Sequence, residues 1–374
     1  MKRGWALALI LLATLCATWQ RAQAVQRLPV DHDELVYLPA AYDYAEMMKA
    51  GHWRDVSAYR GNFEHPPLVK LLFASALWAS GAPEPEWSSL QARGPVPEPA
   101  WPAFRVTRWL SAAAGILQVA LTAAVSPLGA LLLAFDPYHA AYTAEAYLEA
   151  VPGFFALLAV QAFERARAAG EPLRQGWLAA TGSLLGLAAA GKYPYGLVVG
   201  LTLLPFLLHA RAPVRAWAAL AVPTVAVFLL ADPALWPAPL SALWESVTFH
   251  WAYSNHGEDV QKLQLPWFQP LMYLIHPGPA RWHAGVFATG LNAWVLLPLA
   301  LVGARATARA RPVWAVWAGV GVVFLLLWPT KWPQYQLLLL PALCVCAAEG
   351  ARALVKAGAR RLQARRSARA SPGH

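Results

Sequence analysis

The sequence predicts an all-α polytopic membrane protein with about ten transmembrane helices and two long extracytoplasmic loops. Three observations support this fold class. The 374 residues are 58% hydrophobic and only 13% charged, which is well below the charged fraction of soluble domains. The mean hydropathy of +0.39 is correspondingly high. The 19 Trp and 31 Pro also fit, because Trp collects at bilayer interfaces and Pro is tolerated in spanning helices.

Apolar segments suited to crossing a bilayer recur along the chain, since a spanning helix needs about 20 mostly apolar residues. We expect spans at residues 4–19, 107–125, 127–141, 144–163, 176–190, 194–209, 214–231, 285–304, 313–329 and 334–351. The first segment follows Lys2 and Arg3 and resembles a signal peptide ending at Ala22-Gln23-Ala24. Because the rest of the chain spans the membrane repeatedly, we expect this segment to be retained as the first helix, with cleavage as the alternative.

The distribution of basic residues predicts the orientation of the chain. Taking the N-terminus as cytoplasmic, the short outer loops contain only Lys192 and Lys331. The inner loops contain Arg165, Arg167, Arg174, Arg211, Arg215, Arg305, Arg309 and Arg311. This asymmetry is typical of membrane proteins, and it explains the net charge of +10 without a nucleic-acid partner. We therefore expect a multi-pass protein of a bacterial inner or plasma membrane with both termini cytoplasmic.

The same asymmetry determines how the apolar stretch at residues 67–79 is interpreted. If this stretch crossed the membrane, every later basic loop would face outward, so we expect an amphipathic or re-entrant helix at the outer surface. Arg105 and Arg108 then lie at the outer end of a span, where they depart from the rule and are candidates for binding a phosphate.

Two domains are predicted. Residues 1–350 form the transmembrane domain, with long outer loops at residues 20–104 and 232–284, and residues 351–374 form a basic cytoplasmic tail that anchors on anionic lipid and is disordered at its end. Loops of this length in a compact domain are usually functional. The three cysteines, Cys16, Cys344 and Cys346, lie in apolar segments, which argues against a disulfide framework or a zinc knuckle.

Most acids and histidines outside the tail are predicted to face outward. They are Asp31, His32, Asp33, Glu34, Glu64, His65, Asp136, Glu145, Glu149, Asp232, Glu245, His250, His256, Glu258 and Asp259. Glu145 and Glu149 are four residues apart, so on a helix they would share a face. Glu149 begins an apolar run, and an ionisable residue at membrane depth is a functional candidate, with a hydrated interfacial position as the alternative.

Six elements, in order, resemble the C-type glycosyltransferase fold of the protein O-mannosyltransferases and of the aminoarabinose transferases of lipid A. They are Asp33-Glu34 with Tyr37, Ala45-Glu46-Met47, Gly51 and Trp53; Glu64-His65-Pro66-Pro67-Leu68; Asp136-Pro137-Tyr138 to Tyr147-Leu148-Glu149; Ala190-Gly191-Lys192-Tyr193-Pro194; Asp232-Pro233-Ala234-Leu235-Trp236; and Lys331 with Tyr335 and Pro341. Two positions depart from those families: Glu149 stands where Asp is usual, and Pro333-Gln334 stands where Arg is common.

The resemblance implies transfer of a sugar from a polyprenyl-phosphate carrier to an extracytoplasmic acceptor, with membrane lipid as a further partner. Asp33 matches the general base of an inverting reaction, with a helix N-cap as its alternative role. Glu34 and Glu149 are the other expected catalytic residues. The expected phosphate ligands are Lys331, placed first, then Lys192, Arg105, Arg108 and Tyr335.

Two further expectations stay open at this point. Glu64, His65 and His250 could hold a divalent ion such as zinc or manganese, with solvated loop histidines as the alternative. The function could also be transport of a lipid-linked precursor across the membrane, or lipid binding by a non-catalytic relative. Transporters usually place charged residues near the bilayer midplane, whereas the acids here are predicted to lie at the outer face, which favours catalysis.

Overall fold

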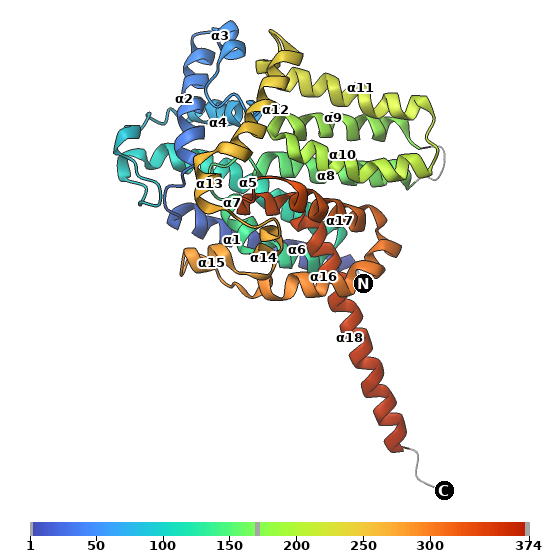
Figure 1. Ribbon diagram of the computed structural model, residues 1–374. Helices are drawn as coiled ribbons and strands as arrows, with labels where there is room; N and C mark the ends of the chain where they lie inside the picture. Colours follow the sequence, from blue (N-terminus) through green and yellow to red (C-terminus); the bar gives the residue numbers. More distant parts are fainter. Residues whose placement is uncertain (1–2, 169–172, 371–374) are drawn as a thin grey trace.

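The computed structural model describes residues 3–168 and 173–370, and the regular elements in these ranges are helices, without a strand (Figure 1). The predicted all-α polytopic fold is therefore confirmed. Nine helices form the main bundle of the described chain: α1 (Arg3–Arg27), α5 (Trp101–Val125), α8 (Ala150–Arg167), α9 (Gln175–Gly191), α10 (Tyr193–His209), α11 (Val214–Ala231), α16 (Leu291–Ala310), α17 (Pro312–Leu327) and α18 (Leu340–Ala370).

Neighbouring helices of this bundle pack through small residues. α9 lies between α8 and α11, and α16 lies against α18. A Cβ built on Gly182 of α9 would lie 2.1 Å from the carbonyl oxygen of Leu220 in α11, and one built on Gly303 of α16 would lie 2.0 Å from that of Cys346 in α18. Without a Cβ, the helix backbones approach closely, which is how helices associate where lipid removes the hydrophobic driving force.

Among the described residues, three helical stretches are long and apolar enough to cross a membrane, by length and composition: Leu7–Arg27, Glu98–Val125 and Val214–Ala231. Only 6% of the Val214–Ala231 window is buried within the protein, so most residues of α11 keep part of their surface outside the helix bundle. Shorter apolar helices include Tyr193–His209 and Pro312–Leu327. The chain is thus an integral membrane protein, and the number of its spans stays a prediction.

The segment expected to form a span at residues 127–141 is two short helices, α6 (Pro127–Ala134) and α7 (Pro137–Tyr142). The break lies at Asp136, whose Oδ1 accepts a hydrogen bond from the main-chain N–H of His139 at 2.9 Å and so caps α7. Pro137 follows at the first position of α7, where its missing N–H has no cost. The next helix also begins later than predicted, at Ala150 instead of residue 144.

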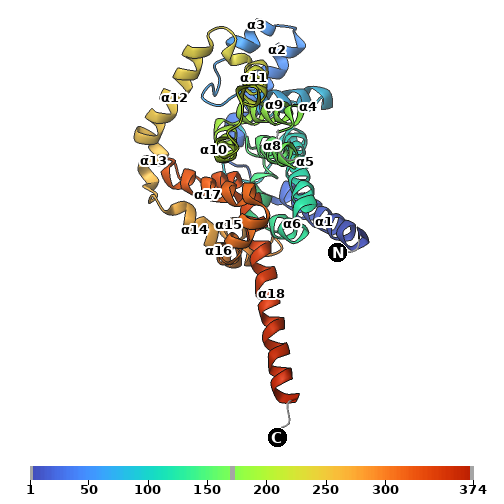
Figure 2. The same cartoon turned by 90° about the vertical axis from the view of Figure 1, so that its right-hand side faces the viewer.

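The two long outer segments contain short helices. The first segment contains α2 (Glu34–Lys49), α3 (Trp53–Ala58), α4 (Leu68–Ser80), η1 (Trp87–Ser89) and η2 (Glu98–Ala100). The second contains η3 (Pro233–Leu235), α12 (Pro239–His256), α13 (Glu258–Leu263), α14 (Gln269–Ile275) and α15 (Gly278–Trp282). Figure 2 shows α12, α13 and α14 as an arc along one side of the bundle, from the end that contains α3 to the end that contains α16.

The stretch predicted to be a surface helix at residues 67–79 is α4. Its 13 residues extend about 20 Å at 1.5 Å per residue, which is short of the ~30 Å hydrocarbon core. Val69, Phe73 and Leu77 form a buried stripe on α4 that packs with α2 and α5. α4 thus joins the first outer segment to the bundle, and its length agrees with a helix that does not cross.

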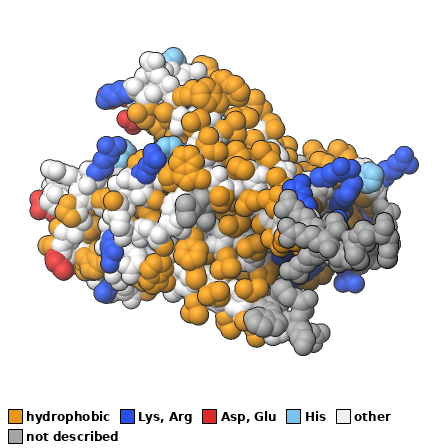
Figure 3. All heavy atoms as spheres, turned by 90° about the horizontal axis from the view of Figure 1, so that it is seen from below, with side chains coloured by type: hydrophobic (Ala, Val, Ile, Leu, Met, Phe, Trp, Pro, Cys, Tyr) orange, Lys and Arg blue, Asp and Glu red, His pale blue; other side chains and the backbone are white. Residues whose placement is uncertain are grey.

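The surface reflects the membrane environment and the basic tail. Figure 3 shows a face with broad hydrophobic coverage and its few acidic side chains at one end. α18 continues well past the bundle (Figure 1), and its residues from Leu354 to Gln363 are exposed. The tail predicted to end in disorder is helical to Ala370, and residues 371–374 lie outside the described residues.

Candidate active site

Asp33 lies at the N-cap position of α2, but its side chain makes no capping hydrogen bond. Its Oδ2 instead accepts a hydrogen bond from the hydroxyl of Tyr37, one turn further along α2, at 3.2 Å. Its main-chain N–H donates to Oδ1 of Asp31 at 3.0 Å, which fixes the turn before the helix. The capping role considered from the sequence is therefore absent, and the partly exposed Asp33 carboxylate stays available for other contacts.

The surroundings of Asp33 favour a carboxyl that can exchange a proton near neutral pH. Burial, followed by the negative charge of Asp31, raises the pKa of Asp33 to about 7. The positive charge of Lys192 acts in the opposite direction, and the charge of Glu149 adds to the increase. These four side chains come from three separate parts of the sequence, so the fold brings them together. A carboxyl group with a pKa near the working pH suits a general base.

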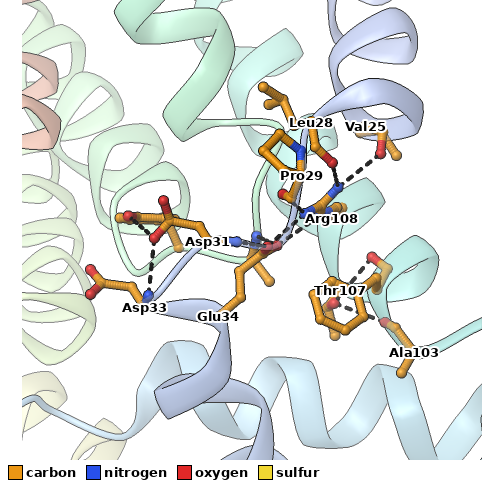
Figure 4. Close-up of polar contacts among 12 residues, drawn as sticks. Val25, Leu28, Pro29, Asp31, Asp33, Glu34, Ala103, Thr107 and Arg108 are labelled. Carbon is orange, nitrogen blue, oxygen red and sulfur yellow. Dashed lines mark hydrogen bonds and ion pairs between the residues drawn. The ribbon is translucent and has the colours of Figure 1, made fainter. Parts of the chain in front are cut away.

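Glu34 and Arg108 form a fully buried ion pair next to Asp33 (Figure 4). Arg108 Nε donates to Oε1 of Glu34 at 2.8 Å, and its Nη2 donates to Oε2 at 2.6 Å. The remaining guanidinium hydrogens bind carbonyl oxygens at the end of α1, namely those of Val25, Leu28 and Pro29. All five donors of Arg108 are thus used inside the protein.

This geometry corrects two expectations. Arg108 has no donor left for a phosphate, and Glu34 has both carboxylate oxygens engaged. Arg105, one turn before Arg108, is exposed, and its phosphate contact stays a prediction. The Glu34–Arg108 pair therefore holds the first outer segment against α1 and α5, while Asp33, its neighbour in sequence, faces the site. The sequence could not separate the two acids because both lie in the same turn.

Lys192 contacts the carboxylate of Glu149 at the junction between α8, α9 and α10. Glu149 precedes α8, and Lys192 is the single residue between α9 and α10. The Lys192 ammonium also lies 5.2 Å from the centre of the Tyr335 ring, within the range of a cation–π interaction. Three residues that the sequence singled out separately, Glu149, Lys192 and Tyr335, are therefore in direct contact.

Lys331, the first choice for a phosphate ligand, has a different environment. Its Nζ donates to the carbonyl oxygens of Leu325 and Leu326 at 2.9 Å each and also to that of Trp328. These carbonyls lie at the C-terminal end of α17, where the helix leaves its last acceptors unpaired. The three ammonium hydrogens are thus occupied in closing a helix end, so Lys331 does not fit the expected role.

The segment at residues 143–149 is irregular and lies against the first outer segment. The Tyr147 hydroxyl donates to Asp31 Oδ1 at 2.5 Å, and the main-chain N–H of Ala146 donates to Glu34 Oε1 at 2.9 Å. Glu145 and Glu149 therefore do not share a helix face, as their spacing had predicted. Burial, with Asp31 and Glu34 nearby, holds the pKa of Glu145 well above its usual range.

Glu64, His65 and His250, which could have held a divalent ion, are not grouped as a metal site. The described residues contain no group of three or more His, Cys, Asp or Glu side chains placed to hold a metal ion. Glu64 Oε1 accepts a hydrogen bond from Asn62 at 2.5 Å, and His250 Nε2 donates to the main-chain oxygen of Glu64 at 2.9 Å. Burial, followed by the charge of Lys192, lowers the pKa of His65 well below its usual range, so its ring is neutral at pH 7.

The site contains three residues whose roles the sequence did not reveal. Tyr37 and Tyr147 appeared only within quoted motifs, yet their hydroxyls bind Asp33 and Asp31. The spacing of four residues between Asp33 and Tyr37 on a predicted helix was an available signal. Lys70 is buried in α4 and donates to the main-chain oxygen of His65 at 3.1 Å, which no sequence pattern predicts.

Comparison with solved structures identifies the fold. The chain is similar to ArnT from Cupriavidus metallidurans in the apo state, with a TM-score of 0.56 and 19% identity over 93% of this chain. It is also similar to the same protein bound to undecaprenyl phosphate, with a TM-score of 0.59 and 19% identity over 94% of this chain. The chain covers 59% and 60% of the length of those structures. It therefore has the fold of the C-type polytopic membrane glycosyltransferases.

A second comparison gives a more particular relationship. Residues 60–229 match the family model described as dolichyl-phosphate-mannose-protein mannosyltransferase. This match includes α4, the Glu64–His65 turn, Glu149 and Lys192, but Asp33 precedes it. No match is found among curated proteins.

Proposed function

We propose that this chain is an integral membrane glycosyltransferase that moves a sugar from a polyprenyl-phosphate carrier to an acceptor hydroxyl on the extracytoplasmic face, with inversion. The observation that carries the proposal is the position of Asp33. It is a partly exposed carboxyl with a pKa of about 7, and the paired Lys192 and Glu149 influence its charge. The site thus combines a proton acceptor with a cation, which are the two groups that displacement of a phosphate by a hydroxyl requires.

In the proposed reaction, Asp33 acts as the general base. The acceptor oxygen attacks the anomeric carbon of the donor sugar while the Asp33 carboxylate removes the hydroxyl proton. The new carbon–oxygen bond forms as the bond from the anomeric carbon to the phosphate oxygen breaks, and the polyprenyl phosphate leaves with that electron pair. A single displacement of this kind inverts the anomeric configuration.

Lys192 is the proposed cation for the leaving phosphate. Arg108 and Lys331 have their hydrogens bound inside the protein, whereas Lys192 contacts one carboxylate and one ring face. Glu149 and Tyr335 would hold the ammonium in place until negative charge develops on the phosphate. A fixed cation at the point where charge appears stabilises the transition state without reorganisation.

The comparisons support the same class of donor. One of the similar crystal structures is bound to undecaprenyl phosphate, and the matching family model describes a transferase that uses dolichyl-phosphate-mannose. Both carriers are polyprenyl phosphates. We extend this class to the present chain as part of the proposal and leave the sugar as hexose or pentose. No step is assigned to a metal ion, because Glu64, His65 and His250 do not fit one.

The proposed orientation follows the basic residues. Both termini are cytoplasmic, residues 1–350 form the catalytic membrane domain, and residues 351–374 form a basic tail at the inner surface. The second outer segment supports this arrangement. His250 Nε2 and Ser246 Oγ of α12 both donate to the main-chain oxygen of Glu64 in the first outer segment, Ser246 at 2.7 Å. The two long outer segments thus meet beside the site, and we place this side outside a bacterial inner or plasma membrane.

The proposal is tested by reconstituting the purified chain with a panel of polyprenyl-phosphate sugars and candidate acceptors and following the products by mass spectrometry. The expected result is transfer from at least one donor, with an inverted linkage by NMR. A lipid-movement assay in vesicles runs in parallel. Lipid movement without transfer from any donor would contradict the proposal and support a transporter.

A further inference from the structure

Arg21 of α1 is fully buried and bound to three polar groups. Its Nε donates to the hydroxyl oxygen of Thr143 at 2.9 Å, one Nη donates to Nδ1 of His139 at 2.5 Å, and the other donates to the carbonyl oxygen of Ala17 at 3.3 Å. Thr143 and His139 are also fully buried. A charged side chain at such depth is costly, so its retention points to a role.

The donors and acceptors give this network a defined direction. Because Arg has no acceptor, Nδ1 of His139 carries no proton and accepts from Arg21. The other ring nitrogen, Nε2, then carries the proton and donates to Oε1 of Gln118 at 3.1 Å. Gln118 must therefore use its amide nitrogen elsewhere, and its Nε2 donates to the carbonyl oxygen of Ala150 at 2.8 Å.

The network contacts both ends of the irregular segment at residues 143–149, which contains Glu149. Thr143 begins this segment, where its hydroxyl accepts from Arg21 and donates to the carbonyl oxygen of His139 at 2.5 Å. Ala150 follows Glu149, the residue that contacts Lys192. A chain of hydrogen bonds from α1 through α7 and α5 thus holds the segment at residues 143–149 at its first residue and just beyond its last.

Two glycines leave the space that the network occupies. A Cβ on Gly115 of α5 would lie 2.5 Å from the Thr143 hydroxyl oxygen and 2.8 Å from Arg21 Nε. A Cβ on Gly153 of α8 would lie 3.1 Å from Gln118 Oε1. The two glycines therefore make room in α5 and α8 for the polar side chains of the network.

We propose that Arg21, His139, Gln118 and Thr143 form a positioning network that sets the place of Glu149, and through it Lys192, for the transfer reaction. This inference rests on the proposed function. None of the four side chains contacts Asp33 or Lys192 in the hydrogen bonds described above. They act by fixing the segment at residues 143–149, so the network affects the rate of the chemical step more than donor binding.

The first test compares Thr143→Val with Thr143→Ser. Val has nearly the shape of Thr without the hydroxyl, whereas Ser keeps the hydroxyl that accepts from Arg21. We expect Thr143→Val to lower kcat about tenfold with a donor KM within about twofold, and Thr143→Ser to stay close to the unmodified protein. Hydrogen exchange followed by mass spectrometry should show faster exchange at residues 143–150 in Thr143→Val only.

The second test substitutes Gly115 of α5. Gly115→Ala places a methyl group against Thr143 and Arg21, and the same substitution at Gly200 of α10 meets nothing within 4 Å. We expect Gly115→Ala to lower kcat and to speed exchange at residues 143–150, and Gly200→Ala to do neither. Equal effects of the two substitutions would overturn the inference.

The readouts separate the inference from the proposed function. If the unmodified chain transfers no sugar, the exchange data still test whether the network holds the segment. Unchanged exchange at residues 143–150 in both Thr143→Val and Gly115→Ala overturns the positioning network, whatever the activity. Faster exchange with an unchanged kcat in an active chain also overturns it, because the network would then serve stability alone.

Discussion

Lys192 contacts one oxygen of the Glu149 carboxylate, and the other oxygen, Oε2, has no hydrogen-bond partner among the described residues. Both side chains are almost completely buried. A buried acceptor without a partner is costly, so the pair with Lys192 is the main interaction that offsets the burial of the Glu149 carboxylate. We propose that this pair holds the Lys192 ammonium in place for the leaving phosphate.

The role of Lys192 predicts a large effect from removing its charge. Lys192→Met should lower kcat about 100-fold, because loss of one preformed charge contact in a transition state costs ~10²–10³ in rate. The measurement is steady-state transfer with the donor identified in reconstitution. Glu149→Gln should keep part of the activity, since it can still position the ammonium.

Lys331 provides the matched comparison for Lys192. Lys331→Met removes the donor to three carbonyls at the end of α17, so it should lower stability by about 1–3 kcal/mol while leaving the donor KM unchanged. Thermal unfolding in detergent and transfer kinetics measure the two effects. A donor KM raised tenfold in Lys331→Met, with unchanged transfer kinetics in Lys192→Met, would contradict this assignment. Lys331, and not Lys192, would then bind the phosphate.

The pKa of Asp33 predicts the acid limb of the pH profile. A general base works in its deprotonated form, and the pKa of Asp33 is raised to about 7 by burial and by Asp31. We expect kcat/KM to rise about tenfold per pH unit below pH 7 and to level off above it, as for titration of one group. A profile that is flat from pH 5 to pH 8 would rule out a base with this pKa.

Tyr37→Phe should move that limb to higher pH. The Tyr37 hydroxyl donates to the Asp33 carboxylate, which stabilises the charged form and lowers the pKa. Without the hydroxyl the pKa of Asp33 increases, so less of the base is deprotonated at pH 7. The pH profile of kcat/KM for the variant measures the shift, and activity at high pH should be close to that of the unmodified chain. A limb that moves to lower pH would contradict this account.

The ion pair of Glu34 with Arg108 predicts a loss of stability instead of a loss of donor binding. Arg108→Met leaves the Glu34 carboxylate buried without a partner, and breaking a buried pair in this way costs about 3–5 kcal/mol. Thermal unfolding of the purified variant measures the loss, which Arg108→Met combined with Glu34→Gln should partly reverse. Arg105→Met serves as the control, because Arg105 is exposed and should have no measurable effect.

The sequence was sufficient for the fold and for part of the site. Composition and apolar segments predicted an all-α membrane protein, and the order of short motifs predicted its class. The break at Asp136 was missed because the apolar content of residues 127–141 continues through it, although Asp-Pro is a common start for a helix. Motif order also marked Asp33, Glu149, Lys192 and Tyr335 without showing that they belong together.

The site predictions that were wrong concern residues whose hydrogen-bond partners are fixed only by the fold. Whether a basic residue is free or already bound depends on carbonyls that only the fold brings near, as for Arg108 at the end of α1 and Lys331 at the end of α17. For the same reason the sequence did not reveal the roles of Arg21 and His139, since their contact joins residues 118 positions apart. Side-chain type and spacing predict which residues lie on one face of the protein. They do not predict which hydrogen-bond donors are still free to bind a ligand.

Asp33 as the general base is tested most directly by sugar transfer with Asp33→Asn, measured by mass spectrometry with the purified chain in lipid and matched to the unmodified chain for amount and unfolding temperature. Asn has nearly the shape of Asp but cannot accept the proton at neutral pH. We expect Asp33→Asn to fold normally, to bind the polyprenyl phosphate carrier and to lose at least about 100-fold in kcat, as for removal of a general base. Transfer at the unmodified rate by Asp33→Asn would rule out Asp33 as the base.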